Sequence, residues 1–190
     1  MVKNIMIVGV GGQGTLLASK LLGWVLVNQG FDVKVSEIHG MSQRGGSVVT
    51  YVRFGDKVYS PVIDKGEADL ILAFEQLEAA RWIEYLKPDG KIIVNTQEME
   101  PMPVITGAME YPENLIEKMR AKGIKVDARD FLEIANRAGS SKAVNIALMG
   151  CLSKSFPEIS DEVWQAGIKA NVPPKFLELN QKAFELGRAE

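Results

Sequence analysis

The sequence of 190 residues contains one cysteine, Cys151, and one histidine, His39. A cubane iron–sulfur cluster or a structural zinc site needs about four thiolate or imidazole ligands. The chain therefore cannot build either kind of site from its own residues. Cys151 lies in an apolar run, and no neighbour in the sequence would lower its pKa, so we expect a buried thiol and not a nucleophile.

Basic clusters and long apolar stretches are also missing. The net charge of −2, without any run of lysine and arginine, gives no electrostatic footprint for nucleic acid. No apolar stretch approaches membrane-spanning length, and the N-terminus has no separate apolar segment and cleavage site of a signal peptide. We therefore expect a cytoplasmic protein that binds neither membrane nor nucleic acid.

The remaining composition is that of a globular protein. Hydrophobic residues make up 46% of the chain and charged residues 24%, and the length is enough for a substantial core. No repeat and no low-complexity tract divides the sequence. We expect residues 1–190 to form a single domain.

The order of the elements predicts an α/β fold. Residues 5–8 form a continuous apolar run, typical of a strand covered on both faces. A glycine loop, a helical pattern and a second strand over 32–38 follow, which predicts a right-handed parallel crossover. Later strands are expected at 68–74, 91–94 and 124–128, and helices at 75–86, 116–121 and 131–137. The sequence thus predicts a Rossmann-like, mostly parallel sheet with flanking helices.

Three regions depart from the alternation of strands and helices. Residues 48–54 predict a strand, the Gly55-Asp56 pair a turn, and 57–60 a return strand, which makes a β-hairpin insertion. Residues 96–112 contain three prolines and predict a surface loop with a short extended piece. Helices expected at 143–152, after Ser160 and after Pro173-Pro174 give a helical C-terminal part.

Two glycine-rich loops follow the first two predicted strands. Since carboxyl ends of parallel strands meet at one edge, these loops are expected side by side where open α/β folds bind ligands. Glycines allow positive φ, so several backbone N–H groups can face one ligand or one partner surface. The candidate residues are Gly9, Gly11, Gly12, Gln13, Gly14, His39, Gly40, Ser42, Gln43, Arg44, Gly45 and Gly46.

Each loop has two readings. The first matches the G-x-G-x-x-G dinucleotide fingerprint, with Glu37 where a ribose-binding acid would lie, although such glycines also serve close packing of helix on strand. The Gln13 amide can bond a ligand or an adjoining loop. Arg44 can bind a phosphate or carboxylate, or pair with an acid and order its own loop. Ser42 and His39 lack a third orienting group, so no catalytic residue is assigned.

Together, the two loops resemble those of the gamma-type component of 2-oxoacid:ferredoxin oxidoreductases. The resemblance covers nearly the full length, and the second loop is its more specific part. Further matches are Val52-Arg53-Phe54-Gly55, Tyr59-Ser60-Pro61, Glu75 with Glu78-Ala79, the run Asn145 to Gly150, and Asn180 with Ala183, Phe184 and Gly187. Within this family the indolepyruvate group is closest. Gly139-Ser140-Ser141 departs from the expected Gly-Asn, which leaves the subfamily open. Aryl pyruvates, pyruvate, 2-oxoglutarate and branched-chain oxoacids stay open as substrates, because the resemblance implies a substrate pocket mostly on another chain.

The resemblance implies oxidative decarboxylation of a 2-oxoacid to an acyl-CoA, with electrons passed to ferredoxin. Thiamine diphosphate, Mg and iron–sulfur clusters would be held by a larger partner subunit, and this chain would hold none and be inactive alone. The single cysteine of this chain agrees with placing the iron–sulfur clusters on the partner subunit. The resemblance further suggests that Arg44 and both glycine loops form the subunit interface or the mouth of the coenzyme A path. Two rival hypotheses are a free-standing NAD or FAD dehydrogenase and a scaffold whose loops only dock a partner.

Overall fold

The first apolar run forms the centre of the sheet. The computed structural model describes residues 2–39 and 45–190, with the backbone alone at His39. Strand β1 (Lys3–Val10) pairs antiparallel with β3 (Ser47–Gly55) and parallel with β4 (Ala68–Ala73). Seven of its eight residues are buried, because helices cover both faces.

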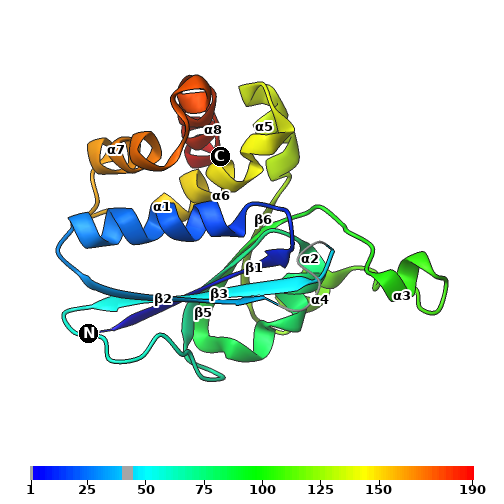
Figure 1. The fold of residues 1–190 in the computed structure, drawn as a ribbon. Helices are drawn as coiled ribbons and strands as arrows, with labels where there is room; N and C mark the ends of the chain where they lie inside the picture. Colours follow the sequence, from blue (N-terminus) through cyan, green and yellow to red (C-terminus); the bar gives the residue numbers. More distant parts are fainter. Residues whose placement is uncertain (1, 40–44) are drawn as a thin grey trace.

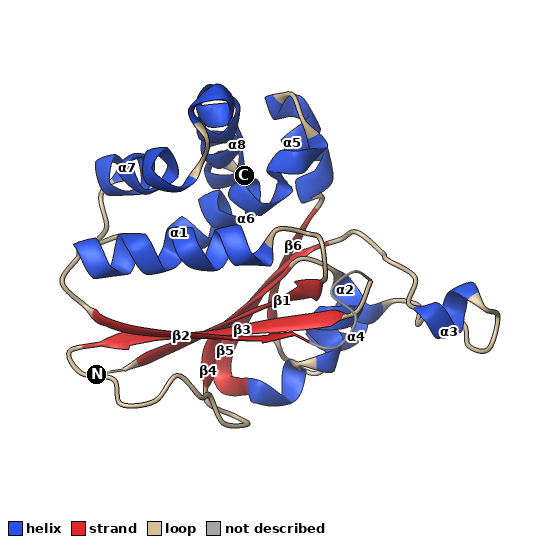
Figure 2. Cartoon of the chain, in the orientation of Figure 1, coloured by secondary structure: helices blue, strands red, loops and turns tan. Residues whose placement is uncertain are grey.

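The described residues form a six-stranded sheet in the order β2-β3-β1-β4-β5-β6, drawn in red in Figure 2. The other strands are β2 (Asp32–His39), β5 (Leu86–Asn95) and β6 (Lys125–Arg129). Only β3 runs against its neighbours within this sheet. The predicted mostly parallel α/β sheet is confirmed. The first two predicted strands are indeed parallel, but β3 lies between them.

Helices form a layer on each face of the sheet (Figure 1). One face is covered by α1, α5, α6, α7 and α8, and the other by α2 and α4. The helices are α1 (Thr15–Asn28), α2 (Gln76–Arg81), η1 (Ile83–Tyr85), α3 (Met102–Ile105), α4 (Leu115–Ala121), α5 (Phe131–Ala138), η2 (Ser141–Ala143), α6 (Val144–Ser153), α7 (Asp161–Asn171), η3 (Pro174–Phe176) and α8 (Leu177–Ala189). None of the helices in the described part combines the length and apolar character needed to cross a bilayer.

The helical C-terminal part is confirmed, and its centre is the contact of α6 with α8. The two backbones approach each other closely at Gly150 and Gly187. A Cβ atom on Gly187 would stand 2.0 Å from the Ala147 carbonyl oxygen. Only glycine fits there, because a backbone carbonyl cannot move aside as a flexible side chain can.

The β-hairpin is present, but its predicted partner strand is wrong. β3 pairs with β2 along its whole length, from Asp32–Gly55 to His39–Val48, and residues 57–60 form no strand. The side chain of Arg53 holds the segment after β3 in place of strand pairing. Its Nη1 donates to the carbonyls of Ser60 (3.0 Å) and Val62 (2.7 Å). β3 has a sheet neighbour on each side, so the following segment has no free strand edge of β3 to join.

The helix predicted over 75–86 is too long. α2 ends at Arg81, η1 follows, and Leu86 already belongs to β5, together with the expected turn at 88–90. Ala68 pairs with Leu86 but Leu70 pairs with Lys91, so the bulge in β5 contains the expected turn residues. The loop predicted over 96–112 differs too, since it contains the short helix α3.

Candidate binding site at the carboxyl edge of the sheet

The first glycine loop connects β1 to α1 at the carboxyl edge. Gly12 and Gly14 have φ values of 103° and 89°, a region that favours glycine. A Cβ on Gly9 would lie 3.0 Å from the Phe74 Cβ, and one on Gly14 would lie 2.6 Å from Asn145 Nδ2. Gly9 therefore serves close packing: its strand lies against Phe74, just after β4, and a Cβ there would also lie 3.2 Å from Thr15 Cγ2 at the start of α1.

Gln13 bonds the loop and the neighbouring strand. Its Oε1 accepts a hydrogen bond from the Val10 N–H at 2.8 Å, and its Nε2 donates to the Phe74 carbonyl at 3.1 Å. Of the two predicted roles for this amide, bonding to adjoining backbone is the one observed. The side chain therefore fixes the loop against the strand that precedes it and against the backbone at Phe74.

The two glycine loops lie side by side, as predicted. The Gly11 N–H donates to the Gly46 carbonyl at 2.9 Å, and the Gly45 N–H donates to the Gly11 carbonyl at 3.4 Å. Gly45 has a φ of 76°. Gly40, Met41, Ser42, Gln43 and Arg44, together with the side chain of His39, lie outside the described residues.

A depression of about 680 Å³ opens beside the first loop. One wall is the loop before α1, and the other is η2 with the start of α6. Asn145, which is buried, donates from Nδ2 to the Gly14 carbonyl at 3.4 Å and joins the two walls. The lining residues are Gly12, Gln13, Gly14, Gln97, Leu132, Ser141, Lys142, Val144 and Asn145.

The electrostatics of this depression favour an anion. α1 has no acidic residue in its first turn, so no side chain there offsets the positive end of its dipole. Lys142 is exposed and has no ion-pair partner among residues 2–39 and 45–190. The N-terminus of a helix, preceded by a glycine loop and lying near one cation, is an arrangement that binds phosphate.

Glu75 connects the start of α2 to the segment that contains α3. It is 1% exposed and caps α2, accepting from the Glu78 N–H at 2.9 Å. The same carboxylate accepts from the Met99 N–H at 3.3 Å and from the Tyr111 hydroxyl. Burial and Glu75 together raise the pKa of Tyr111, which keeps its hydroxyl a donor. A buried carboxylate thus fixes both ends of the segment around α3.

Glu78 connects α2 to the second glycine loop. It accepts from the Ser47 hydroxyl, directly after Gly46, and lies 3.2 Å from Arg81 Nε. Burial raises the pKa of Glu78, while Ser47 and Arg81 oppose that shift. The two glutamates of α2 therefore hold two different chain segments against one edge of the sheet.

Several residues of this edge were not predicted as site residues. Asn145 and Lys142 are far from the loops in sequence, and the signals for Asn145 are its place in a matched run and its polar side chain within an otherwise apolar helix. Glu75 and Glu78 are among the positions that match the family, but the sequence predicts no role for them. In the structure Glu75 caps α2 and accepts from the Glu78 N–H three residues later.

The arrangement differs from a dinucleotide-binding fold. There the strand that carries the ribose-binding acid is the direct neighbour of β1. Here β3 lies between β1 and β2. The Ser19 hydroxyl on α1 donates to Glu37 Oε1 at 3.0 Å, so this carboxylate bonds to the helix.

Cys151 is buried, as predicted. It is 1% exposed, its Sγ donates to Asp127 Oδ2 at 3.6 Å, and burial raises the pKa of the thiol. Within the described residues, no group of three or more His, Cys, Asp or Glu is placed to hold a metal ion. A protonated, buried thiol beside a carboxylate does not fit a cluster ligand.

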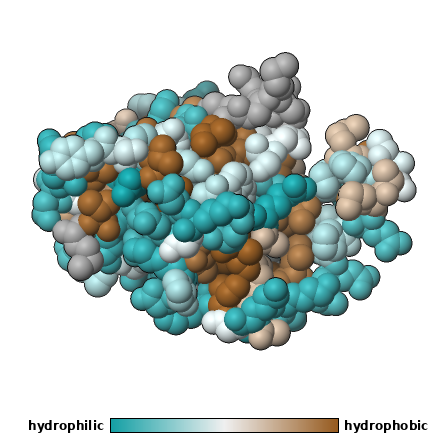
Figure 3. Space-filling view, turned by 90° about the horizontal axis from the view of Figure 1, so that it is seen from below, coloured by the Kyte–Doolittle hydropathy of each residue, from teal (hydrophilic) through white to brown (hydrophobic). Residues whose placement is uncertain are grey.

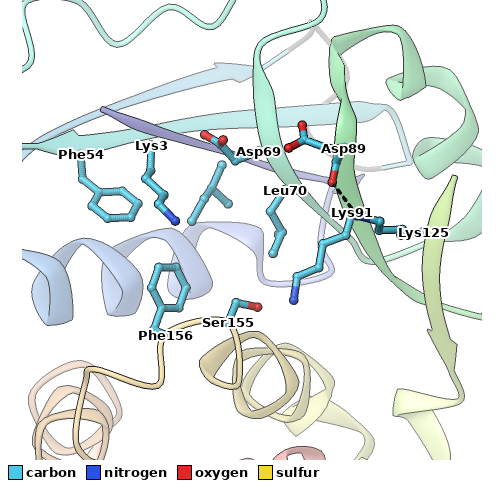
Figure 4. A pocket seen from close by; sticks show the side chains of 10 residues that line it. Lys3, Phe54, Asp69, Leu70, Asp89, Lys91, Lys125, Ser155 and Phe156 are labelled. Atoms are coloured by element: carbon cyan, nitrogen blue, oxygen red, sulfur yellow. Dashed lines mark hydrogen bonds between the residues drawn. The ribbon is translucent and has the colours of Figure 1, made fainter. Parts of the chain in front are cut away.

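A second depression, of about 300 Å³, lies at the opposite edge of the sheet (Figure 4). Phe54 and Phe156 form its apolar wall, and Lys3, Lys91 and Lys125 surround it. It contains no residue of the glycine loops. It is therefore separate from the candidate site.

Comparison with known proteins gives matches over nearly the whole chain. Residues 4–190 match the family model described as pyruvate ferredoxin/flavodoxin oxidoreductase. The chain is 44% identical over 191 residues to the indolepyruvate oxidoreductase subunit IorB of Thermococcus kodakarensis, covering 97% of this chain and 93% of that protein.

Solved structures share the fold. The pyruvate oxidoreductase subunit PORC of Thermotoga maritima superposes with a TM-score of 0.75 at 21% identity, covering 100% of this chain and 96% of that one. The 2-oxoglutarate:ferredoxin oxidoreductase of Magnetococcus marinus, with 2-oxoglutarate, coenzyme A and succinyl-CoA bound, gives a TM-score of 0.75 at 20% identity. That match covers 99% of this chain and 30% of the other.

Proposed function

The chain belongs to the pyruvate ferredoxin/flavodoxin oxidoreductase family, the subunits of 2-oxoacid:ferredoxin oxidoreductases, and we propose that it is the small, cofactor-poor subunit of an indolepyruvate or aryl pyruvate oxidoreductase. The 44% identity to an indolepyruvate oxidoreductase subunit, over almost the full length of both chains, supports this substrate class. In this proposal residues 1–190 act as one gamma-type domain.

The proposed reaction needs a partner. A 2-oxoacid loses CO₂, its acyl group is transferred to the thiol of coenzyme A, and the electrons released reduce ferredoxin. On the partner, thiamine diphosphate with Mg would serve as the electron sink and iron–sulfur clusters would carry the electrons. One cysteine and one histidine cannot supply the cluster ligands, so we assign the clusters, and thiamine diphosphate with them, to a larger subunit.

The part that we assign to this chain is to border the partner's active site and guide coenzyme A. The first glycine loop leads into the N-terminus of α1 and is bonded through Gly11 to Gly46, and Lys142 lines the depression beside it. These are the groups that would bind the phosphates of coenzyme A. Arg44 lies outside the described residues, and we assign it to the same mouth or to the subunit interface.

Purification of the tagged chain from its native host tests the subunit assignment. We expect a large, cysteine-rich partner that contains thiamine diphosphate, and reduction of a viologen dye by the complex with indolepyruvate and coenzyme A. Phenylpyruvate, pyruvate, 2-oxoglutarate and a branched-chain oxoacid should be slower. Turnover of NAD or FAD substrates by the chain alone would contradict the proposal.

Charge reversal at Lys142 tests the assignment of the coenzyme A path. In the assembled enzyme, Lys142→Glu is expected to raise the KM for coenzyme A by about tenfold, the effect of roughly 1.4 kcal/mol in binding. Arg44→Ala should act in the same direction or weaken subunit association. Lys154→Glu is the matched control, because Lys154 is exposed at the other end of α6.

Two results would contradict this assignment. Unchanged coenzyme A saturation in both Lys142→Glu and Arg44→Ala would exclude the proposed path. Altered assembly with normal kinetics of the assembled enzyme would favour the scaffold hypothesis, in which the loops only dock a partner.

A further inference from the structure

Residues 97–111 form a projecting segment, called the α3 arm below, that extends away from the body of the molecule (Figures 1 and 2). Its side chains Met102, Ile105 and Met109 are exposed to 64%, 61% and 65%. Grouped, exposed apolar side chains of this size mark interaction sites. We propose that the α3 arm docks into an apolar groove with a basic rim on the large subunit; this rests on the proposed function.

The base of the arm is fixed to the body on both sides. Gln76 Nε2 donates to Glu98 Oε1 at 2.7 Å, on the segment that enters the arm. Glu75, which is buried, accepts from the Met99 N–H on the entering side and from the Tyr111 hydroxyl on the returning side. The arm is therefore ordered before it binds, which lowers the entropic cost of docking.

The tip of the arm is held by its own backbone. The Pro101 carbonyl accepts from the Val104 N–H at 2.8 Å, and the Pro103 carbonyl accepts from the N–H groups of Ala108 (2.9 Å) and Met109 (3.0 Å). The prolines also restrict the unfolded chain. The exposed apolar side chains thus stand on a fixed frame, as an anchor for a preformed groove requires.

The charge around the arm selects the partner. Lysine and arginine are absent from residues 92–117, and the carboxylates there are Glu98, Glu100, Glu110, Glu113 and Glu117. Arg81 lines the depression at the base of the arm, where it lies 3.2 Å from Glu78 and is offset by that carboxylate. Packing of one arm against the arm of a second copy would bring like charges together, which is unfavourable. Lysines and arginines on a different chain would complement this acidic base.

The arm is continuous with the glycine loops. A depression of about 310 Å³ lies between them and shares Gly45, Gly46 and Ser47 with the second loop and Met99 and residues 101–103 with the arm. In the space-filling view the arm stands clear of the rest of the surface (Figure 3). A subunit that covers the loops is therefore also reached by the arm.

Binding of the purified large subunit to immobilised wild-type and variant chains tests the docking. The triple variant Met102→Glu, Ile105→Glu, Met109→Glu is expected to raise the Kd by at least about 30-fold, because it removes the apolar anchors. The control Val27→Glu, Val62→Glu changes side chains of similar exposure elsewhere, 56% and 52%, and should change the Kd less than about threefold. Unchanged thermal unfolding of the triple variant shows that its fold is intact.

A second variant tests the charge. Glu100→Gln with Glu110→Gln should lower the association rate and flatten its dependence on salt. If the association rate of this variant depended on salt as strongly as that of the wild type, the proposed basic rim would be contradicted.

The outcomes separate the docking proposal from the proposed function. If the wild-type chain does not bind the large subunit, the proposed function and the docking both fail. If the wild type binds and the triple variant binds within about threefold of it, the proposed function stands and the arm proposal is overturned.

Discussion

Replacing Gln13 by alanine should destabilise the protein even though the residue lies in a loop. The change removes two hydrogen bonds, from the Val10 N–H at 2.8 Å and to the Phe74 carbonyl at 3.1 Å. Each contributes about 1 kcal/mol net, and a backbone N–H left without an acceptor adds a further penalty. Because Gln13 is half-buried, water can satisfy part of what is lost. We expect the free energy of unfolding to fall by about 2–3 kcal/mol.

Urea unfolding followed by tryptophan fluorescence measures this change. Gln13→Glu keeps an acceptor for Val10 but loses the donor to Phe74, so at neutral pH it should also be less stable than the wild type. Gln29→Ala is the matched control, since Gln29 is exposed at the other end of α1 and its loss should cost less than about 0.5 kcal/mol. A Gln13→Ala protein as stable as this control would refute the structural role and leave the amide available for a ligand.

Three further predictions concern the same edge and the helical layer. Gly187→Ala should lower the free energy of unfolding by about 3 kcal/mol or more, because its Cβ would lie 2.0 Å from the Ala147 carbonyl; urea unfolding measures it. The pKa of Glu78 is higher in the native protein than in the unfolded chain, so the free energy of unfolding should fall as the pH rises between these two pKa values. Urea unfolding at a series of pH values measures this fall, and Glu78→Gln should remove it. Cys151 should react with a thiol reagent on the order of a thousandfold more slowly in the native than in the unfolded protein; equal rates would contradict its burial.

Much of the fold follows from local signals in the sequence. The apolar run over 5–8 predicts a strand covered on both faces, and β1 is such a strand. The glycines between β1 and α1 predict a tight connection at the carboxyl edge, and Gly12 and Gly14 have the positive φ that this requires. These predictions succeed because a few consecutive residues determine the conformation.

The errors concern pairing between distant segments. A strand pattern over 48–54 does not state which strand will be its neighbour, and the nearest candidate in the sequence, 57–60, is not the partner. Arg53 and its bonds to the following segment decide that local geometry through side chains. The helix over 75–86 ends early because β5 begins at Leu86 and pairs with Ala68 through a bulge.

The candidate site could be predicted in part. The first loop lies beside Gly45 and Gly46 of the second, and the cause is the antiparallel pairing of β1 with β3, which puts Val10 opposite Ser47. Lys142 and Asn145 could not be assigned to the site from local patterns, since the bond from Asn145 to Gly14 joins residues 131 positions apart. Packing of α6 beside α1 on one face of the sheet brings Asn145 and Gly14 together.

Hydrogen–deuterium exchange of the chain, alone and in complex with the large subunit, shows which surface the large subunit covers. We expect slower exchange in the complex for residues 9–14, 45–47 and 97–111, which form the loop edge and the α3 arm. Exchange at the opposite edge, around Lys3, Lys91 and Lys125, should not change. Protection of that opposite edge, with the loops and the arm unaffected, would contradict the account.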